Sequence, residues 1–178
     1  MKNSLSILFL LISLNAWSQS ATVDISLRPA GSFKIKCSEV KGFATQKGNA
    51  VEAKDIAVVM KNLTTGIALR DDHTKKHLEV EKFPEAVLVS AKGQDGKGEG
   101  LVRIKGIEHK VSGTYKINGS NLEAEFPVKI SDFGITGVKY MGVGVSDDAK
   151  VSVIVPIKAE AAASATPATP PAKSKTKK

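Results

Sequence analysis

The stretch NLEAEFPVKI, residues 121–130, has the most regular pattern in the chain. Its apolar and polar residues alternate one by one, with Leu122, Ala124, Phe126, Val128 and Ile130 opposing Glu123, Glu125, Pro127 and Lys129. Successive side chains of a β-strand point to opposite faces of a sheet, so this pattern predicts a strand with one buried face.

The same two-residue period recurs along the chain. It is clear over residues 22–28, 32–37, 110–117 and 150–157, and less regular over 40–45, 50–60, 86–92 and 98–106. Asn118-Gly119 and the segment GQDGKGEG (93–100) favour short antiparallel hairpins. The prolines at 127 and 156 fall on the outward faces of their strands and cannot donate to a ladder, so each is expected at an edge or a bulge.

Eight or nine strands of this kind predict an all-β domain. Such a chain closes into a barrel or packs as a sandwich, because both arrangements shield the strand edges, and we favour the barrel. The segment 69–82, LRDDHTKKHLEVEK, breaks the period and predicts a short helix or ordered loop across one end. Only 5% of the residues are aromatic, too few for the girdles of a membrane barrel, so the apolar face is expected inside.

Residues 1–20 have the order of a secretory signal peptide. Lys2 is followed by an apolar run from Leu5 to Leu14, and then by small residues up to a cleavage site after Ser18 or Ser20. A run of about ten apolar residues is too short for a membrane anchor, which needs roughly twenty. The sequence therefore predicts export to the periplasm and a mature chain that does not span the membrane.

The predicted domain spans residues 21–158, and residues 159–178, AEAAASATPATPPAKSKTKK, predict a disordered tail. The tail carries a net +3 of the chain's +8, and without it and Lys2 the domain carries +4. That mild charge, with no basic stripe interleaved with aromatic residues, argues against nucleic-acid binding. The tail is interpreted as a solvated tether, with contact to an anionic envelope surface as the alternative.

Residues with catalytic or metal-binding chemistry are few. His73 and His77 have the i, i+4 spacing of a zinc site, but a third ligand would have to come from Asp71, Asp72 or His109, so we interpret them as solvated. The glycines of 93–100 precede a strand rather than a helix, which favours hairpin turns over a phosphate loop. Cys37 lies on an apolar face and is expected to be a buried hydrophobe. The sequence thus predicts no enzyme, no cofactor and no metal site.

Four segments together resemble the YceI-like family of periplasmic proteins: GIALRDDHTKKHLEVEKFPEAVLVSA (66–91), GEGLVRIKGIEHKVSGTYKI (98–117), FPVKISDFGI (126–135) and VSVIVPI (151–157). The resemblance implies an eight-stranded antiparallel, lipocalin-like barrel with one or two short helices. It also implies a carrier that holds an amphiphilic lipid, an isoprenoid or isoprenoid quinone, inside the barrel without catalysis. Family members often dimerise, so a homodimer is one state to test.

A barrel of this size either is filled by its side chains or holds one slim ligand. Ten positions are expected to face inward and to contact such a ligand: Phe33, Ile35, Val111, Tyr115, Leu122, Ala124, Phe126, Val128, Val153 and Val155. Small residues at 113 and 124 would leave room for a chain, and the Tyr115 hydroxyl would be free for a polar head. Arg70, Asp71 and His73 are expected at the rim, as a gate or an anchor.

Two functions stay open at this stage. The first is a lipid carrier, and the second is a solid-cored barrel that acts as a stress-related or interaction protein at the cell envelope. A cavity large enough for a chain would distinguish the two.

Overall fold

The structure, a computed structural model, describes residues 19–159. The predicted signal peptide and the predicted tail lie outside this range, except for Gln19, Ser20 and Ala159.

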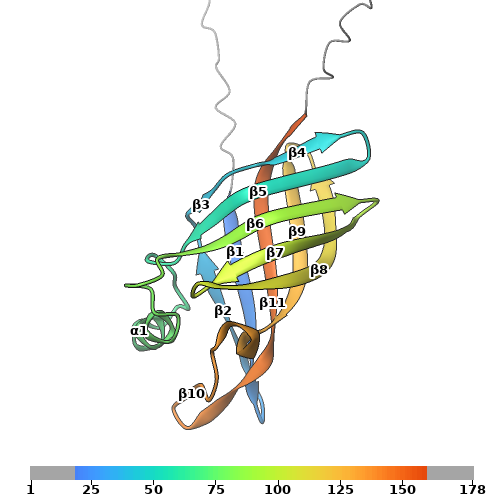
Figure 1. Cartoon of the computed structure of the whole chain (residues 1–178). Helices are drawn as coiled ribbons and strands as arrows, with labels where there is room; N and C mark the ends of the chain where they lie inside the picture. The colour runs from blue at the N-terminus through green and yellow to red at the C-terminus, as the bar shows by residue number, and fades with distance from the viewer. Residues whose placement is uncertain (1–18, 160–178) are drawn as a thin grey trace, which may run out of the picture.

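The described chain is mostly β-structure, as predicted (Figure 1). Its strands in chain order are β1 (Ser20–Arg28), β2 (Ser32–Cys37), β3 (Val40–Lys41), β4 (Ala44–Lys47), β5 (Ala50–Val59), β6 (Glu85–Gln94), β7 (Lys97–Ile104), β8 (Ile107–Asn118), β9 (Asn121–Lys129), β10 (Lys139–Tyr140) and β11 (Val143–Ala159). The helix α1 (Ala68–His77) and the 3-10 helix η1 (Ile130–Phe133) complete the fold.

The strands close into a barrel, which confirms the predicted fold. Pairing runs β4–β5–β6–β7–β8–β9–β11, and β11 also pairs with β4, so seven strands form the ring. The β11–β4 pairing is parallel, whereas the resemblance implies eight antiparallel strands. The long strand β11 accounts for the difference, because it pairs with β1 up to Ile154 and passes to β4 from Ile157. The strand β1 and its partner β2 are outside this closed set of pairings, but their side chains, such as Ile25 and Cys37, belong to the buried core of the barrel.

Both prolines occupy positions where one neighbouring strand is missing. Pro156 lies between the end of the β1 pairing and the start of the β4 pairing, and Pro127 lies on β9 beyond Glu125, where the pairing with β8 ends. A residue without an N–H leaves no donor unpaired there. Pro156 is nevertheless fully buried, although the alternation places it on the outward face.

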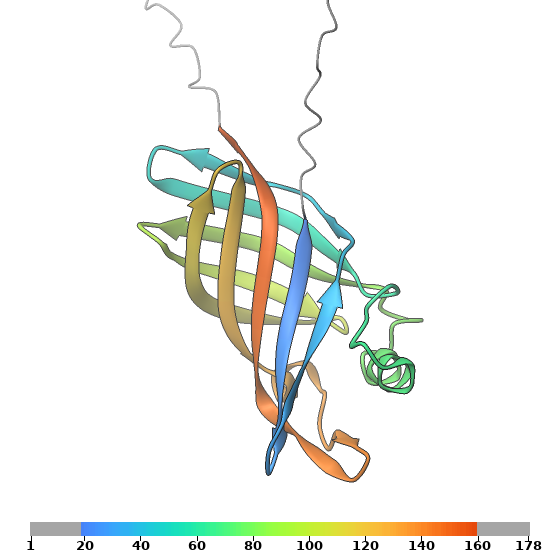
Figure 2. The ribbon, with the colours of Figure 1, turned by 180° about the vertical axis from the view of Figure 1, so that it is seen from behind.

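The barrel has two different ends (Figures 1 and 2). At the turn end, the hairpins β4–β5, β6–β7 and β8–β9 lie together with both ends of the described chain. At the helix end lie α1, η1 and β10, as predicted for the charged segment 69–82.

Gly113 lets β9 approach β8 closely. A Cβ built on this residue would stand 2.1 Å from the carbonyl oxygen of Glu125 and 2.7 Å from Cβ of Phe126. Gly113 lines the barrel cavity, and the space that a side chain would need at this position is taken by the backbone of β9, so room for a ligand chain beside it stays a prediction. Gly113 precedes the residue where the pairing of β8 with β7 ends and its pairing with β9 begins, Thr114.

Candidate functional site

The barrel is hollow. It contains a partly open cavity of about 240 Å³, whereas a single buried water needs roughly 10–15 Å³ by the same measure. Apolar side chains from all parts of the ring line it, among them Val51, Ile56, Leu88, Val102 and Phe133. The charged residues along its wall point outward; Lys92 and Glu52, for example, pair at 3.4 Å with exposed side chains. The cavity is thus suited to an apolar ligand.

Nine of the ten predicted interior residues line this cavity: Ile35, Val111, Tyr115, Leu122, Ala124, Phe126, Val128, Val153 and Val155. The tenth, Phe33, lines a smaller cavity at the helix end, as does Ile35. Contact of these side chains with a ligand stays a prediction.

The hydroxyl of Tyr115 faces the β4–β5 turn, and its contact with a head group stays a prediction. This hydroxyl donates a hydrogen bond to the carbonyl oxygen of Asn49 at 3.4 Å, in the β4–β5 turn. Its ring lies against Gly93, where a Cβ would stand 2.5 Å from Cε1 of the tyrosine. Tyr115 therefore helps to close the turn end of the cavity.

The interior faces of β5 and β6 could not be predicted from strict alternation. On β5 the cavity is lined by Val51 and Ala53 and then by Ile56 and Val58, so the inward phase shifts by one residue at Asp55. Asp55 has φ of 51°, in the left-handed region that side chains rarely adopt. The neighbouring strand β6 has a register irregularity after Leu88. The irregular alternation of 50–60 and 86–92 is the one sequence signal of this shift.

The glycines of the segment 93–100 do not all lie in turns. Gly96 is in the two-residue turn between β6 and β7, with φ of 81°. The interpretation as turn residues is wrong for Gly93, Gly98 and Gly100, which lie within the strands and line the cavity. Because glycine has no side chain, the neighbouring strands and the Tyr115 ring can pack closely against these positions.

A second cavity of about 90 Å³, which we call the vestibule, lies beside α1 at the helix end. Its apolar lining includes Phe33, Val138, Tyr140 and Val145. It shares with the barrel cavity the lining residues Ile25, Ile35, Leu78, Ile130 and Ile135. The two cavities are therefore neighbours that share one wall.

The predicted rim residue Arg70 lies in the vestibule. Its guanidinium carbon is 4.4 Å from the ring centroid of Phe33 and 5.5 Å from that of Tyr140, both distances within cation–π range. Its Nη2 donates to the carbonyl oxygen of Thr65 at 2.7 Å. Its Nε is buried and has no hydrogen-bond partner among the described residues. His73, a second predicted rim residue, packs edge-on against Tyr140 and also lines the vestibule.

Asp71, the third predicted rim residue, points away from the vestibule and fixes the start of α1. Its Oδ1 accepts hydrogen bonds of 2.6 Å from the backbone N–H and from the hydroxyl of Thr65, and its Oδ2 accepts one from Thr64. These bonds, above all the one from the Thr65 hydroxyl, hold the pKa of Asp71 below its usual value. Asp71 thus orders the turn that precedes Arg70, and among the described residues its carboxylate bonds to Thr64 and Thr65 rather than to the guanidinium of Arg70.

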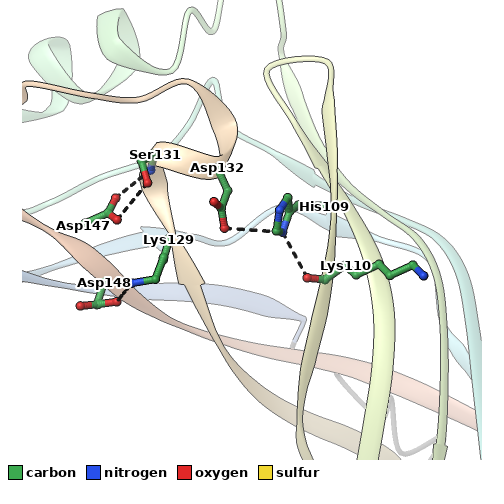
Figure 3. Close-up of polar contacts among 7 residues, drawn as sticks. All are labelled: His109, Lys110, Lys129, Ser131, Asp132, Asp147 and Asp148. Atoms are coloured by element: carbon green, nitrogen blue, oxygen red, sulfur yellow. Dashed lines mark hydrogen bonds and ion pairs between the residues drawn. The ribbon is translucent and has the colours of Figure 1, made fainter.

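Polar side chains also hold η1 against the barrel (Figure 3). The backbone N–H and hydroxyl of Ser131 donate to Asp147 on β11 at 2.8 and 2.9 Å, and they lower the pKa of Asp147. Asp132 of η1 faces β8, where Nδ1 of His109 lies 3.5 Å from its carboxylate. These contacts position Phe133, which is 1% exposed and forms part of the cavity wall at the helix end.

The other candidates of the sequence have no assembled site. Cys37 is buried against the barrel cavity, and burial raises the pKa of its thiol to about 11, so it remains protonated at neutral pH. Within residues 19–159, no three His, Cys, Asp or Glu side chains are grouped as metal ligands. His73 and His77 instead share the lining of the vestibule.

The sequence matches the YceI-like domain over residues 15–159, which is most of the chain. The protein belongs to the YceI-like family. This confirms the resemblance found in the four sequence segments. A search among curated proteins gave no match.

Solved structures of this YceI-like fold include three relatives. Burkholderia cenocepacia BcnA has 14% identity and a TM-score of 0.57, with 77% of this chain and 94% of BcnA covered. A polyisoprenoid binding domain from Saccharophagus degradans, implicated in plant cell wall breakdown, has 10% identity and a TM-score of 0.53, with coverage of 79% and 93%. The YceI protein mutant CJ-N182C with a monobromobimane guest has 14% identity and a TM-score of 0.53, with coverage of 68% and 81%. At these identities the likeness shows the fold.

Neither described helix of this YceI-like chain has the length and apolar character needed to cross a membrane.

Proposed function

We propose that this protein is a periplasmic carrier that holds one amphiphilic, polyisoprenoid-type lipid in its barrel cavity and catalyses no reaction. The observation that carries the proposal is the hollow, apolar interior of about 240 Å³. A side-chain-filled barrel, the alternative from the sequence, would have no reason to keep such a space, because interiors are normally packed with few voids larger than a water.

Burial of a hydrocarbon chain supplies the affinity. Each methylene moved from water into the cavity contributes about 0.8 kcal/mol, so a few isoprene units are enough for stable retention. The polyisoprenoid class is supported by family membership and by the shared fold of the Saccharophagus degradans polyisoprenoid binding domain. An isoprenoid quinone has the same kind of chain and belongs to the same proposal.

The decisive test is native mass spectrometry of the protein purified from the cells that make it, followed by organic extraction and identification of any released lipid. We expect one isoprenoid-sized adduct per chain, and the same spectrum reports whether the protein is a monomer or a homodimer.

A matched pair of variants locates the adduct. Ala124→Phe places a phenyl ring inside the cavity, and Ser112→Phe places the same ring on the exposed outer face of β8. We expect Ala124→Phe to lose the adduct and Ser112→Phe to keep it. An adduct-free wild-type protein that also fails to take up added geranylgeraniol would refute the carrier and favour the interaction protein.

Export is part of the same proposal. Cleavage after Ser18 would leave β1 whole, because Ser20 already pairs with Ile154. We expect the mature protein in the periplasmic fraction with Gln19 as its first residue. An uncleaved chain in the cytosol would refute this part.

A further inference from the structure

We infer that the vestibule binds an anionic head group, a phosphate or a carboxylate, of the lipid whose chain occupies the barrel cavity. The inference rests on the proposed carrier function and adds the chemical class of the ligand's polar end.

The position of the vestibule suits a head group. It shares Ile25, Ile35 and Leu78, among others, with the barrel cavity, so a ligand can extend from one to the other along a common apolar wall. At the other end of the barrel cavity the Tyr115 hydroxyl faces the carbonyl oxygen of Asn49, and Lys92 is paired with Glu52 on the outer surface. A ligand with one polar end is therefore oriented with that end toward α1.

The charge of the vestibule has one sign. Its basic lining residues are Arg70, His73, His77 and Lys139, and none of the described residues that line it is an aspartate or a glutamate. The nearest acid in sequence, Asp71, is engaged by Thr64 and Thr65. Arg70 and Lys139 give this partly enclosed space a positive charge, which attracts an anion and gives no advantage to a neutral head.

Arg70 supplies a fixed cation. The rings of Phe33 and Tyr140 stack on its guanidinium, and one nitrogen is bonded to Thr65, so the group is held in place. An oxyanion is the acceptor that a guanidinium binds best, so the guanidinium of Arg70 in the wall of the vestibule favours an anion there.

The test compares three probes with the same prenyl chain and different heads: geranylgeranyl phosphate, geranylgeranoic acid and geranylgeraniol. Dissociation constants come from isothermal titration calorimetry of the full mature protein. We expect both anions to bind at least about tenfold more tightly than the alcohol, since a hydrogen bond to a charged group contributes more than a neutral one. The order of phosphate and carboxylate then identifies which anion the vestibule prefers.

Two substitutions of arginine by glutamine form the control. Arg70→Gln should reduce the ratio of phosphate to alcohol affinity about tenfold or more. Arg103→Gln removes the same charge from the outer face of β7, where Arg103 pairs with Glu108, and should leave the ratio unchanged. Should Arg70→Gln fail to fold, Lys139→Gln is expected to lower the ratio about threefold by loss of part of the local positive field.

The outcomes separate the two proposals. If all three probes bind the wild type equally, or if Arg70→Gln and Arg103→Gln change the ratio alike, the anionic head-group site is refuted and the carrier stands. If no probe binds, the carrier is refuted and the head-group site with it.

Discussion

The two ends of the barrel differ in whether backbone N–H groups donate to carboxylates. At the turn end the backbone pairs with itself: the N–H of Tyr115 donates to Gly96 and that of Ile157 to Ser120, in addition to the ladders. At the helix end, carboxylates hold the longer connections, Asp71 to the start of α1 and Asp147 to η1. Backbone bonds do not titrate over the usual pH range, whereas bonds to exposed carboxylates depend on charge.

This difference assigns separate roles to the two ends. Regions with few buried apolar contacts and exposed hydrogen bonds open at the lowest free energy, and α1 contains no buried residue. The vestibule lies beside α1. We therefore expect the wall and the turn end to determine global stability, and the helix end to open for the ligand.

The largest effect is expected from Gly113→Ala in the wall. The added Cβ meets the backbone of β9 at Glu125, which cannot move without disturbing the β8–β9 and β9–β11 ladders. We expect a loss of about 2–3 kcal/mol in the free energy of unfolding, typical of overpacking. Urea denaturation followed by far-ultraviolet circular dichroism measures it.

Gly144→Ala is the matched change at the helix end. A Cβ on Gly144 has no atom within 4 Å, so the free energy of unfolding should change by less than about 0.5 kcal/mol. Equal losses from both substitutions would contradict the assignment of stability to the wall.

The regular strands of the barrel wall could be predicted from the sequence, because their side chains alternate between the inner and the outer face. β9 and β11 have one face inside the barrel along most of their lengths. Leu122, Ala124 and Val153, which are predicted to face inward, all line the cavity. β5 and β6 break the rule at Asp55 and after Leu88, where backbone geometry shifts the phase. The parallel closure of β11 on β4 joins segments more than 100 residues apart, and no local pattern encodes it.

The helix end could be predicted only in outline. The charged segment 69–82 and the position of Arg70 at the rim follow from composition and from the family resemblance. The stacking of Arg70 between Phe33 and Tyr140 brings together three segments that are distant in sequence. Each of these residues has an ordinary interpretation when taken alone, so their association needs the tertiary structure.

A smaller, local effect is expected from Asp147→Ala. The substitution removes the acceptor of both Ser131 bonds and frees η1 from β11. Amide hydrogen exchange should accelerate over residues 130–135, while residues of β8 and β9 keep their protection. Asp148→Ala is the control, because its exposed carboxylate pairs with Lys129 alone and leaves η1 in place. Uniform acceleration across the barrel would show that η1 is not a separate unit.

The smallest effect is a pH dependence confined to the helix end. Hydrogen bonds from Thr65 lower the pKa of Asp71 in the folded state below its ordinary value of 3.8. A carboxyl with a lowered folded pKa stabilises the fold above its unfolded pKa, and this contribution is lost as the pH falls through the folded pKa. Protection factors over residues 64–78 should therefore decrease between about pH 5 and about pH 2.5, more than those of β8 and β9.

Asp71→Asn separates this titration from general acid effects. Asparagine keeps one oxygen acceptor for the Thr65 N–H but carries no charge, so the segment 64–78 should be less protected already at pH 5 and change little on acidification. If wild type and Asp71→Asn lose protection in parallel, another group controls the helix end. Titration of Asp71 would then not be the cause of any opening of the helix end in acid. Access to the cavity would instead be controlled by movement of η1 or by the ligand itself.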